Sequence, residues 1–300
     1  MGGTSPLPTL PKTERGLRLT FQLWALASCA AIVIDHSGRG LTQLVSSETR
    51  PVATPARKQV KHRAFFVGLG LFAIAIALIA FVPEYWRSAA GRFPIPLPLH
   101  LHGALMAAWL ATFVLQALLV SRGQVTLHRT IGPWAVGLGV AVWGSMVFVA
   151  VRRLVVHPLP LEWAGYDELL QDVYTDTTFI ALLLWAIYER RRPAWHKRLL
   201  AVAIFVTLLA PVERLEWLPE LGIGFIWASA LWLDLGVVAA LVGYDLILAR
   251  RLHPATMGGL ALLLAAQATT VLAWGSAPWR HFAFLAAHAL RSAFGGEGGL

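Results

Sequence analysis

The sequence predicts an all-α membrane protein with seven transmembrane helices, and three observations support this fold class. Hydrophobic residues make up 57% of the 300 residues and charged residues only 14%, whereas a soluble domain is about 25% charged. Seven mostly apolar stretches approach or exceed the roughly 20 helical residues that cross a bilayer core. Basic residues lie between these stretches, so the net charge of +9 indicates membrane topology and not nucleic-acid binding.

The predicted spans are seven separate apolar segments, and the short apolar run at 19–34 is not counted among them. Each span must be helical because lipid cannot satisfy free backbone N–H and C=O groups. The single cysteine excludes a disulfide framework and a cysteine-based metal centre. The spans cover roughly residues 64–83, 100–120, 131–151, 173–188, 199–217, 222–248 and 257–275.

The distribution of Lys and Arg predicts the orientation in the membrane. Loops with many basic residues alternate with loops that hold few, and the richer set belongs inside the cell. This places the N-terminus inside and the C-terminus outside a bacterial inner membrane. The richer set contains Arg57, Lys58, Lys61, Arg63, Arg122, Arg129, Arg190, Arg191, Arg192, Lys197, Arg198, Arg250 and Arg251.

Three regions are expected along the chain. Residues 1–58 are rich in Thr, Pro, Ser and Gly and are predicted to be a disordered or leader-like extension. Residues 59–290 form the transmembrane domain, and 291–300 a flexible tail. The segment from Leu26 to Cys29 resembles a lipoprotein cleavage box, but removal of a leader would place the mature N-terminus outside, against the predicted orientation.

A histidine beside basic residues precedes every span that starts on the inside: His62, His128, His196 and His253. This repetition predicts three antiparallel hairpins with short inner turns, formed by spans 2–3, 4–5 and 6–7, plus one added N-terminal span. Two interpretations of the histidines remain open. They anchor the helix ends among lipid head groups, or His128 and His196 bind haem iron from facing helices.

A second set of candidate ligands lies on the outer side. His100 and His102 open the second span, where they are candidate cofactor or zinc ligands together with Asp176. Their spacing of two puts them on different faces of a helix. Joint ligation therefore needs extended backbone there, which the neighbouring prolines make plausible.

Ionisable residues inside the predicted spans are candidates for ion pairs, proton carriers or ligand sites. Asp176 shares one helix face with Glu168 and Asp172, since the three are spaced by four. Glu213, Arg214 and Asp234 are further ionisable residues inside the predicted spans. Asp245 follows Asp234 by eleven residues, so the two share a helix face.

The segment His128-Arg129-Thr130-Ile131-Gly132 resembles a widespread group of uncharacterised bacterial polytopic membrane proteins, whose hallmark is a His-Arg-x-x-Gly start to a span. The segments at 195–200 and 251–256 resemble that group too, and the likeness covers roughly 64–285. The group is similar in outline to b-type cytochromes with several transmembrane histidines, which implies haem b as cofactor. Such cytochromes carry their ligands inside helices, whereas His128 and His196 are predicted to precede theirs.

These observations favour a haem-binding transmembrane redox protein. Two alternatives are a proton-coupled transporter of a small solute or cation, based on Asp176, Glu213, Arg214 and Asp234, and a zinc-dependent membrane enzyme, based on His100 and His102. A purely structural role also remains open. The lipid bilayer is the expected partner, and no nucleic acid is expected.

Overall fold

The computed structural model describes residues 56–156, 163–215 and 236–294, and all of its regular elements in these ranges are helices. The predicted all-helical class is therefore confirmed. The predicted extension 1–58 lies almost entirely outside the described residues. In chain order the helices are α2 (Ala56–Ala89), α3 (Leu97–Ser121), α4 (Val125–Val156), α5 (Trp163–Tyr188), η1 (Glu189–Arg191), α6 (Pro193–Thr207), α7 (Leu209–Glu213), η3 (Val238–Val242), η4 (Asp245–Ala249), α9 (Pro254–Ala273) and α10 (Ala277–Phe294).

Five helical segments among the described residues are long and apolar enough to cross a membrane. They are His62–Ala89, Leu97–Ser121, Val125–Val156, Pro193–Glu213 and Pro254–Ala273. The helix α5 is not among them, although it has 26 residues, because four acidic residues lie between its start and its middle: Asp167, Glu168, Asp172 and Asp176. Large apolar side chains cover the outer faces of the long helices, with Leu78 of α2 56% and Leu101 of α3 58% exposed. A helix that is apolar all round suits lipid on one side and protein on the other.

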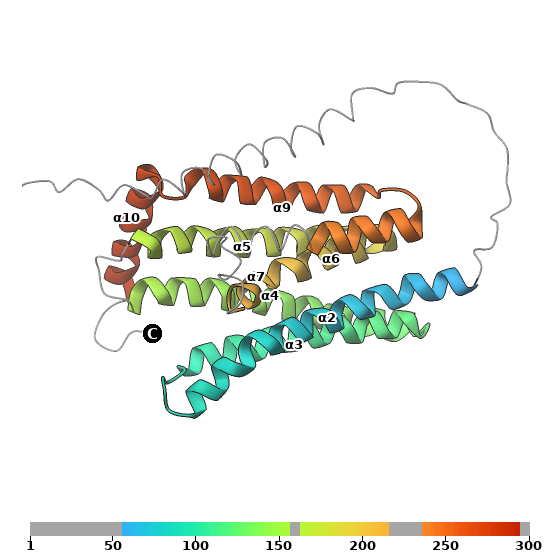
Figure 1. The fold of residues 1–300 in the computed structure, drawn as a ribbon, viewed down its shortest axis with the longest axis horizontal. Helices are drawn as coiled ribbons and strands as arrows, with labels where there is room; N and C mark the ends of the chain where they lie inside the picture. Colours follow the sequence, from blue (N-terminus) through green and yellow to red (C-terminus); the bar gives the residue numbers. More distant parts are fainter. Residues whose placement is uncertain (1–55, 157–162, 216–235, 295–300) are drawn as a thin grey trace, which may run out of the picture.

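The long helices lie side by side, and α10 crosses one end of the bundle (Figure 1). A short turn around Gly123, whose φ of +77° suits glycine, joins α3 to α4. The segment η1 joins α5 to α6, and Pro193 occupies the first turn of α6, where its missing N–H costs nothing. Part of the third predicted hairpin, residues 216–235, lies outside the described residues.

The core is centred on α6, which is buried along most of its length between α5, α9 and α2. Leu182, Leu199, Ile204 and Leu263 are completely buried there. Because α6 is surrounded by protein, its polar side chains must find partners inside the bundle.

The helix α10 is an element that the sequence analysis did not predict. It extends to Phe294, so residues 291–294 of the expected tail are helical. Its first turns are bound to α5: Arg280 pairs with Asp167 at 2.7 Å, and Trp279 Nε1 donates to the carbonyl of Tyr166 at 2.9 Å. These contacts attach α10 to the bundle. One face of α10 is polar, and the helix is not among the segments that are apolar enough to cross a membrane.

Replacement of Gly139 by alanine should destabilise the fold. Gly139 lies in α4, where an added Cβ would be 2.8 Å from Leu183 Cδ2 and 3.0 Å from Trp109 Cζ3. Such overpacking typically costs about 1–3 kcal/mol, which thermal unfolding in detergent would detect. Gly144→Ala on the same helix is the matched control, because nothing lies within 4 Å of its Cβ position. Equal melting temperatures of the two variants would contradict the prediction.

Candidate functional site

Contacts at one end of the bundle link the four histidines that precede the predicted inner span starts: His62 and Lys197 both contact Tyr244, His196 contacts His128, and His253 packs on Trp195. They come from four different elements. His62 is in α2, His128 in α4 and His196 in α6, while His253 is the N-cap of α9. This common end brings together ring systems that lie far apart in the sequence.

The rings of His128 and His196 make a T-shaped contact at this end. Their ring centroids are 6.4 Å apart and the ring planes are 76° from parallel. His196 Nδ1 lies 2.8 Å from the carbonyl oxygen of Ala186. Because a carbonyl only accepts, Nδ1 carries the proton, and Nε2 of the neutral ring keeps a free lone pair. Histidines that bind metals are usually held by such a hydrogen bond through their other nitrogen.

The structure places both histidines inside their helices, each as the fourth residue, because α4 begins at Val125 and α6 at Pro193. The expectation that His128 and His196 precede their helices was therefore wrong. The length of an apolar stretch indicates only the part of a helix that is embedded in lipid. Both α4 and α6 begin several residues before their apolar stretches, in a segment that contains polar residues.

The spacing of the two rings fits a shared metal ion. An imidazole nitrogen binds a metal at about 2.0–2.1 Å, so rings on opposite sides of one ion have centroids roughly 6 Å apart. The observed 6.4 Å matches this distance. His128 Nδ1 is buried and has no hydrogen-bond partner among the described residues.

The outer histidines are not brought together. His102 Nδ1 lies 2.9 Å from Ser145 Oγ, whose own proton goes to the carbonyl of Val142 at 2.7 Å. His102 Nδ1–H is therefore the donor, and Nε2 is its free nitrogen. His100 instead packs its ring against Tyr85, with centroids 5.5 Å apart.

The helix α3 begins at Leu97, so His100 and His102 are helical and the extended backbone required for joint ligation is not present. Across the described ranges, no group of three or more His, Cys, Asp or Glu side chains is close enough to hold a metal ion. The zinc site built from these two histidines and Asp176 thus has no support in the geometry.

The carboxylates of α5 have different partners. Arg153 of α4 bridges Glu168 at 2.9 Å and Asp172 at 2.6 Å, in line with the predicted shared face. Asp176 is 7% exposed, and no hydrogen bond or ion pair joins it to a described residue. Buried carboxylates without partners are costly in a membrane, so Asp176 stays a candidate proton carrier.

The remaining intramembrane candidates lie near the end of α7. Glu213 is hydrogen-bonded by Gln171 of α5. Arg214 donates to the carbonyl of Ala210 at 2.8 Å and lies over the Phe81 ring at 4.9 Å. Asp234 lies outside the described residues.

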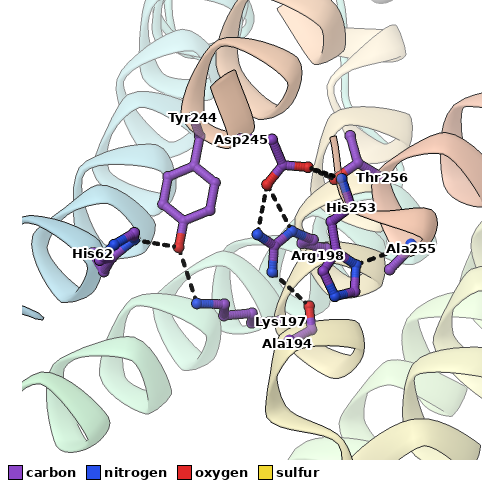
Figure 2. A network of polar contacts seen from close by, with 9 residues as sticks. All are labelled: His62, Ala194, Lys197, Arg198, Tyr244, Asp245, His253, Ala255 and Thr256. Carbon is purple, nitrogen blue, oxygen red and sulfur yellow. Dashed lines mark hydrogen bonds and ion pairs between the residues drawn. The ribbon is translucent and has the colours of Figure 1, made fainter. Parts of the chain in front are cut away.

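A buried ion pair near the histidines was not predicted from the sequence (Figure 2). Arg198 of α6 donates to Asp245 Oδ1 through Nε at 2.9 Å and through a terminal nitrogen at 2.5 Å. Asp245 Oδ2 accepts from Thr256 Oγ1 at 2.6 Å and from the backbone N–H of His253 at 2.9 Å. All four hydrogen bonds to the carboxylate come from α6 and the start of α9, so the pair joins these two helices to η4.

A tyrosine beside the ion pair extends the network to α2 (Figure 2). The Tyr244 oxygen accepts from Lys197 Nζ at 3.0 Å and lies 2.9 Å from His62 Nδ1. Lys197 Nζ is also 5.0 Å from the centroid of the Phe66 ring, a cation–π distance. His62 of α2 and Lys197 of α6 therefore both contact Tyr244 and connect their helices through it.

His253 has a capping role at the start of α9. Its Nδ1 accepts from the N–H of Ala255 at 3.1 Å, which satisfies a donor that the first helical turn leaves free. Burial, and next the charge of Arg198, lowers the pKa of His253, and this keeps Nδ1 available as an acceptor. Of the four inner histidines, only His128 and His196 contact each other.

Comparison of the chain with protein-family models, with curated proteins and with solved structures gives no match. The functional argument therefore depends on the contacts described above.

Proposed function

We propose that the protein is a haem-binding transmembrane redox protein of the b-type cytochrome kind, in which His128 and His196 would hold the haem. The observation that supports it most is the contact between these two rings from different helices, whose centroids are 6.4 Å apart. The hydrogen bond from His196 to Ala186 adds support, because it leaves Nε2 free to bind iron. Bound haem would supply one-electron transfer.

The protein's own groups would position and shield this site. The carbonyl of Ala186 orients the His196 ring, and the neighbouring Trp195 packs against His253, with ring centroids 5.7 Å apart. The Arg198–Asp245 ion pair joins α6 to η4 and α9 two residues after His196. A ligand helix fixed in this way keeps its imidazole at a constant distance from the facing ring.

The proposal includes a membrane topology finer than the five spans described. We propose seven spans in a bacterial inner membrane, with the N-terminus inside and the histidine-bearing end of the bundle on the cytoplasmic side. The support is the concentration of Lys and Arg in the loops at that end. The fourth span would be α5, and the sixth would end in η3 and η4.

An absorption spectrum of the purified protein tests the proposal. Protein from haem-replete cells should be coloured, with a Soret band that shifts on reduction with dithionite, at close to one haem per chain by the pyridine haemochrome assay. Apoprotein titrated with hemin should develop the same band. A colourless preparation that also fails to bind added hemin would contradict haem binding.

A proton-coupled transporter of a small solute or cation is the second candidate. It is favoured by Asp176, which is buried without a hydrogen-bond or ion-pair partner among the described residues, and by Glu213, which is bound by an amide and not by a cation. Carboxylates in such surroundings can gain and lose protons within a membrane. Their distance from the histidine end means that the two candidate functions involve different parts of the bundle.

A further inference from the structure

The helix α10 has an exposed apolar stripe beside the face that contacts the bundle. Ala283 and Ala287 are completely buried, in a cluster with side chains of α4 and α5. The apolar stripe consists of Phe282, Leu285 and Ala289, which are spaced by three and four residues and therefore share one helix face. Phe282 is 61% exposed and Leu285 is 53% exposed. Large apolar side chains of α10 therefore meet the surroundings of the protein.

The polar side chains of α10 lie on its other exposed side. His281, His288 and Ser292 are exposed and are spaced by seven and four residues, so they form a second face, the polar stripe. Successive residues turn by about 100° around an α-helix, which puts Arg280 and Arg291 between the polar stripe and the bundle. The exposed surface of α10 is thus divided lengthwise into an apolar and a polar side, as in helices that lie at the boundary between lipid and water.

The direction of α10 agrees with such a boundary. The long helices are apolar enough to cross a membrane along their length, whereas α10 crosses the end of their bundle (Figure 1). The 18 residues of α10 therefore run along the membrane surface. Nearby apolar side chains also point outward, with Val156 at the end of α4 47% exposed and Leu272 near the end of α9 59% exposed. Because α10 packs on Leu154 and follows α9 after three connecting residues, its apolar stripe extends the apolar outer surface of the bundle.

We propose that α10 is an interfacial helix, whose apolar stripe inserts among lipid acyl chains and whose polar stripe faces the head groups and water. In the proposed topology it lies at the outer surface of the membrane. Lipid is the partner that fits this geometry, because a helix that runs along the membrane surface meets lipid over its whole length, and burial of Phe282 and Leu285 there is favourable. The sequence of α10 contains no acidic residue, so none of its side chains repels lipid phosphates.

This placement fixes the depth of α5 in the membrane. Asp167, in the second turn of α5, pairs with Arg280 at 2.7 Å and accepts from the N–H of Gly275 at 2.8 Å. These contacts hold Asp167 at the level of α10. Asp176 follows nine residues later, which is about 14 Å deeper by helix rise. The buried carboxylate of Asp176 then lies near the middle of a hydrocarbon core about 30 Å thick.

Spin-label accessibility tests the placement on the full-length protein in liposomes of phosphatidylethanolamine and phosphatidylglycerol. In a Cys29→Ser background, which removes the single cysteine, a nitroxide is attached at Leu285→Cys or Ala289→Cys in the apolar stripe. In the polar stripe it is attached at His288→Cys or Ser292→Cys. Oxygen concentrates in hydrocarbon, and a nickel chelate stays in water. The ratio of oxygen to nickel collisions should therefore be several times higher in the apolar stripe than in the polar stripe.

Leu101→Cys is the matched control, because Leu101 is 58% exposed on α3, which is long and apolar enough to cross the membrane. Its collision ratio should be at least as high as that of the apolar stripe. All the labelled positions are exposed, and unchanged melting temperatures verify the fold. Equal ratios in the two stripes would overturn the proposal, since they would place α10 wholly in water or wholly in hydrocarbon. Protection of Leu285→Cys from both reagents would overturn it too, because protein, such as a second copy of the chain, would then cover the apolar stripe.

Discussion

Replacement of Asp245 by alanine should lower the free energy of unfolding by about 3–5 kcal/mol, because it leaves a buried guanidinium without its counter-ion. Asp245 is completely buried and Arg198 is 4% exposed. The substitution also removes the acceptor for Thr256 and for the backbone N–H of His253. The start of α9 therefore loses its connection to α6 at the same time.

Thermal unfolding in detergent, with unfolding in SDS mixtures for the free energy, measures this loss. Asp172→Ala is the matched control, since Asp172 pairs with Arg153 at 2.6 Å but is 37% exposed. An exposed pair of that kind contributes at most about 1 kcal/mol. The double variant R198M/D245L should recover most of the stability, because it removes both charges. A loss for Asp245→Ala no larger than for Asp172→Ala would contradict a stabilising role of the buried pair.

The sequence analysis predicted the helices that face lipid better than it predicted their contacts. Apolar length located α3 closely, because each position along it has to avoid exposing polar groups to acyl chains. The same criterion started the expected spans too late, after His128 and His196, since a helix continues wherever its backbone is hydrogen-bonded, whether or not its side chains are apolar. Hydropathy alone therefore does not predict where a helix begins or ends in the interfacial region of the membrane.

The ion pair between Arg198 and Asp245 shows what sequence patterns miss. Its two members are 47 residues apart and lie in different helices, so no periodicity along one helix connects them. Asp245 was noted only for its position relative to Asp234, and Arg198 only as a basic residue that indicates topology. A buried aspartate near the end of a span and an arginine near the start of another are a signal for such a pair, but the choice among many arginines depends on tertiary packing.

For the candidate site, the sequence analysis named His128 and His196 as a pair, and the structure places their rings in contact. It could not separate them from His62 and His253, which have the same sequence surroundings. The difference lies in the partners: His62 contacts Tyr244, and His253 caps α9. Four equivalent positions in the chain thus have three different environments in the fold.

The two interpretations of the histidines predict opposite results for alanine substitution. If His128 and His196 bind haem, then His128→Ala and His196→Ala should each reduce haem content by at least about tenfold, since a ligand contributes no less than the outer groups that support it. His62→Ala and His253→Ala should retain haem, because these rings contact other partners. If all four histidines only anchor helix ends at the head groups, the four substitutions should have similar and small effects.

Rescue by imidazole separates ligation from a loss of folding. In His196→Gly, the missing side chain leaves room for free imidazole to bind iron opposite His128, so added imidazole should restore the Soret band and the reduced spectrum. A helix weakened only by the glycine would not respond to imidazole in this way. The hydrogen bond to the carbonyl of Ala186 is lost in this variant, so the restored band should require more imidazole than a preorganised ligand would. Loss of haem in all four histidine variants, or no recovery with imidazole, would contradict axial ligation by this pair.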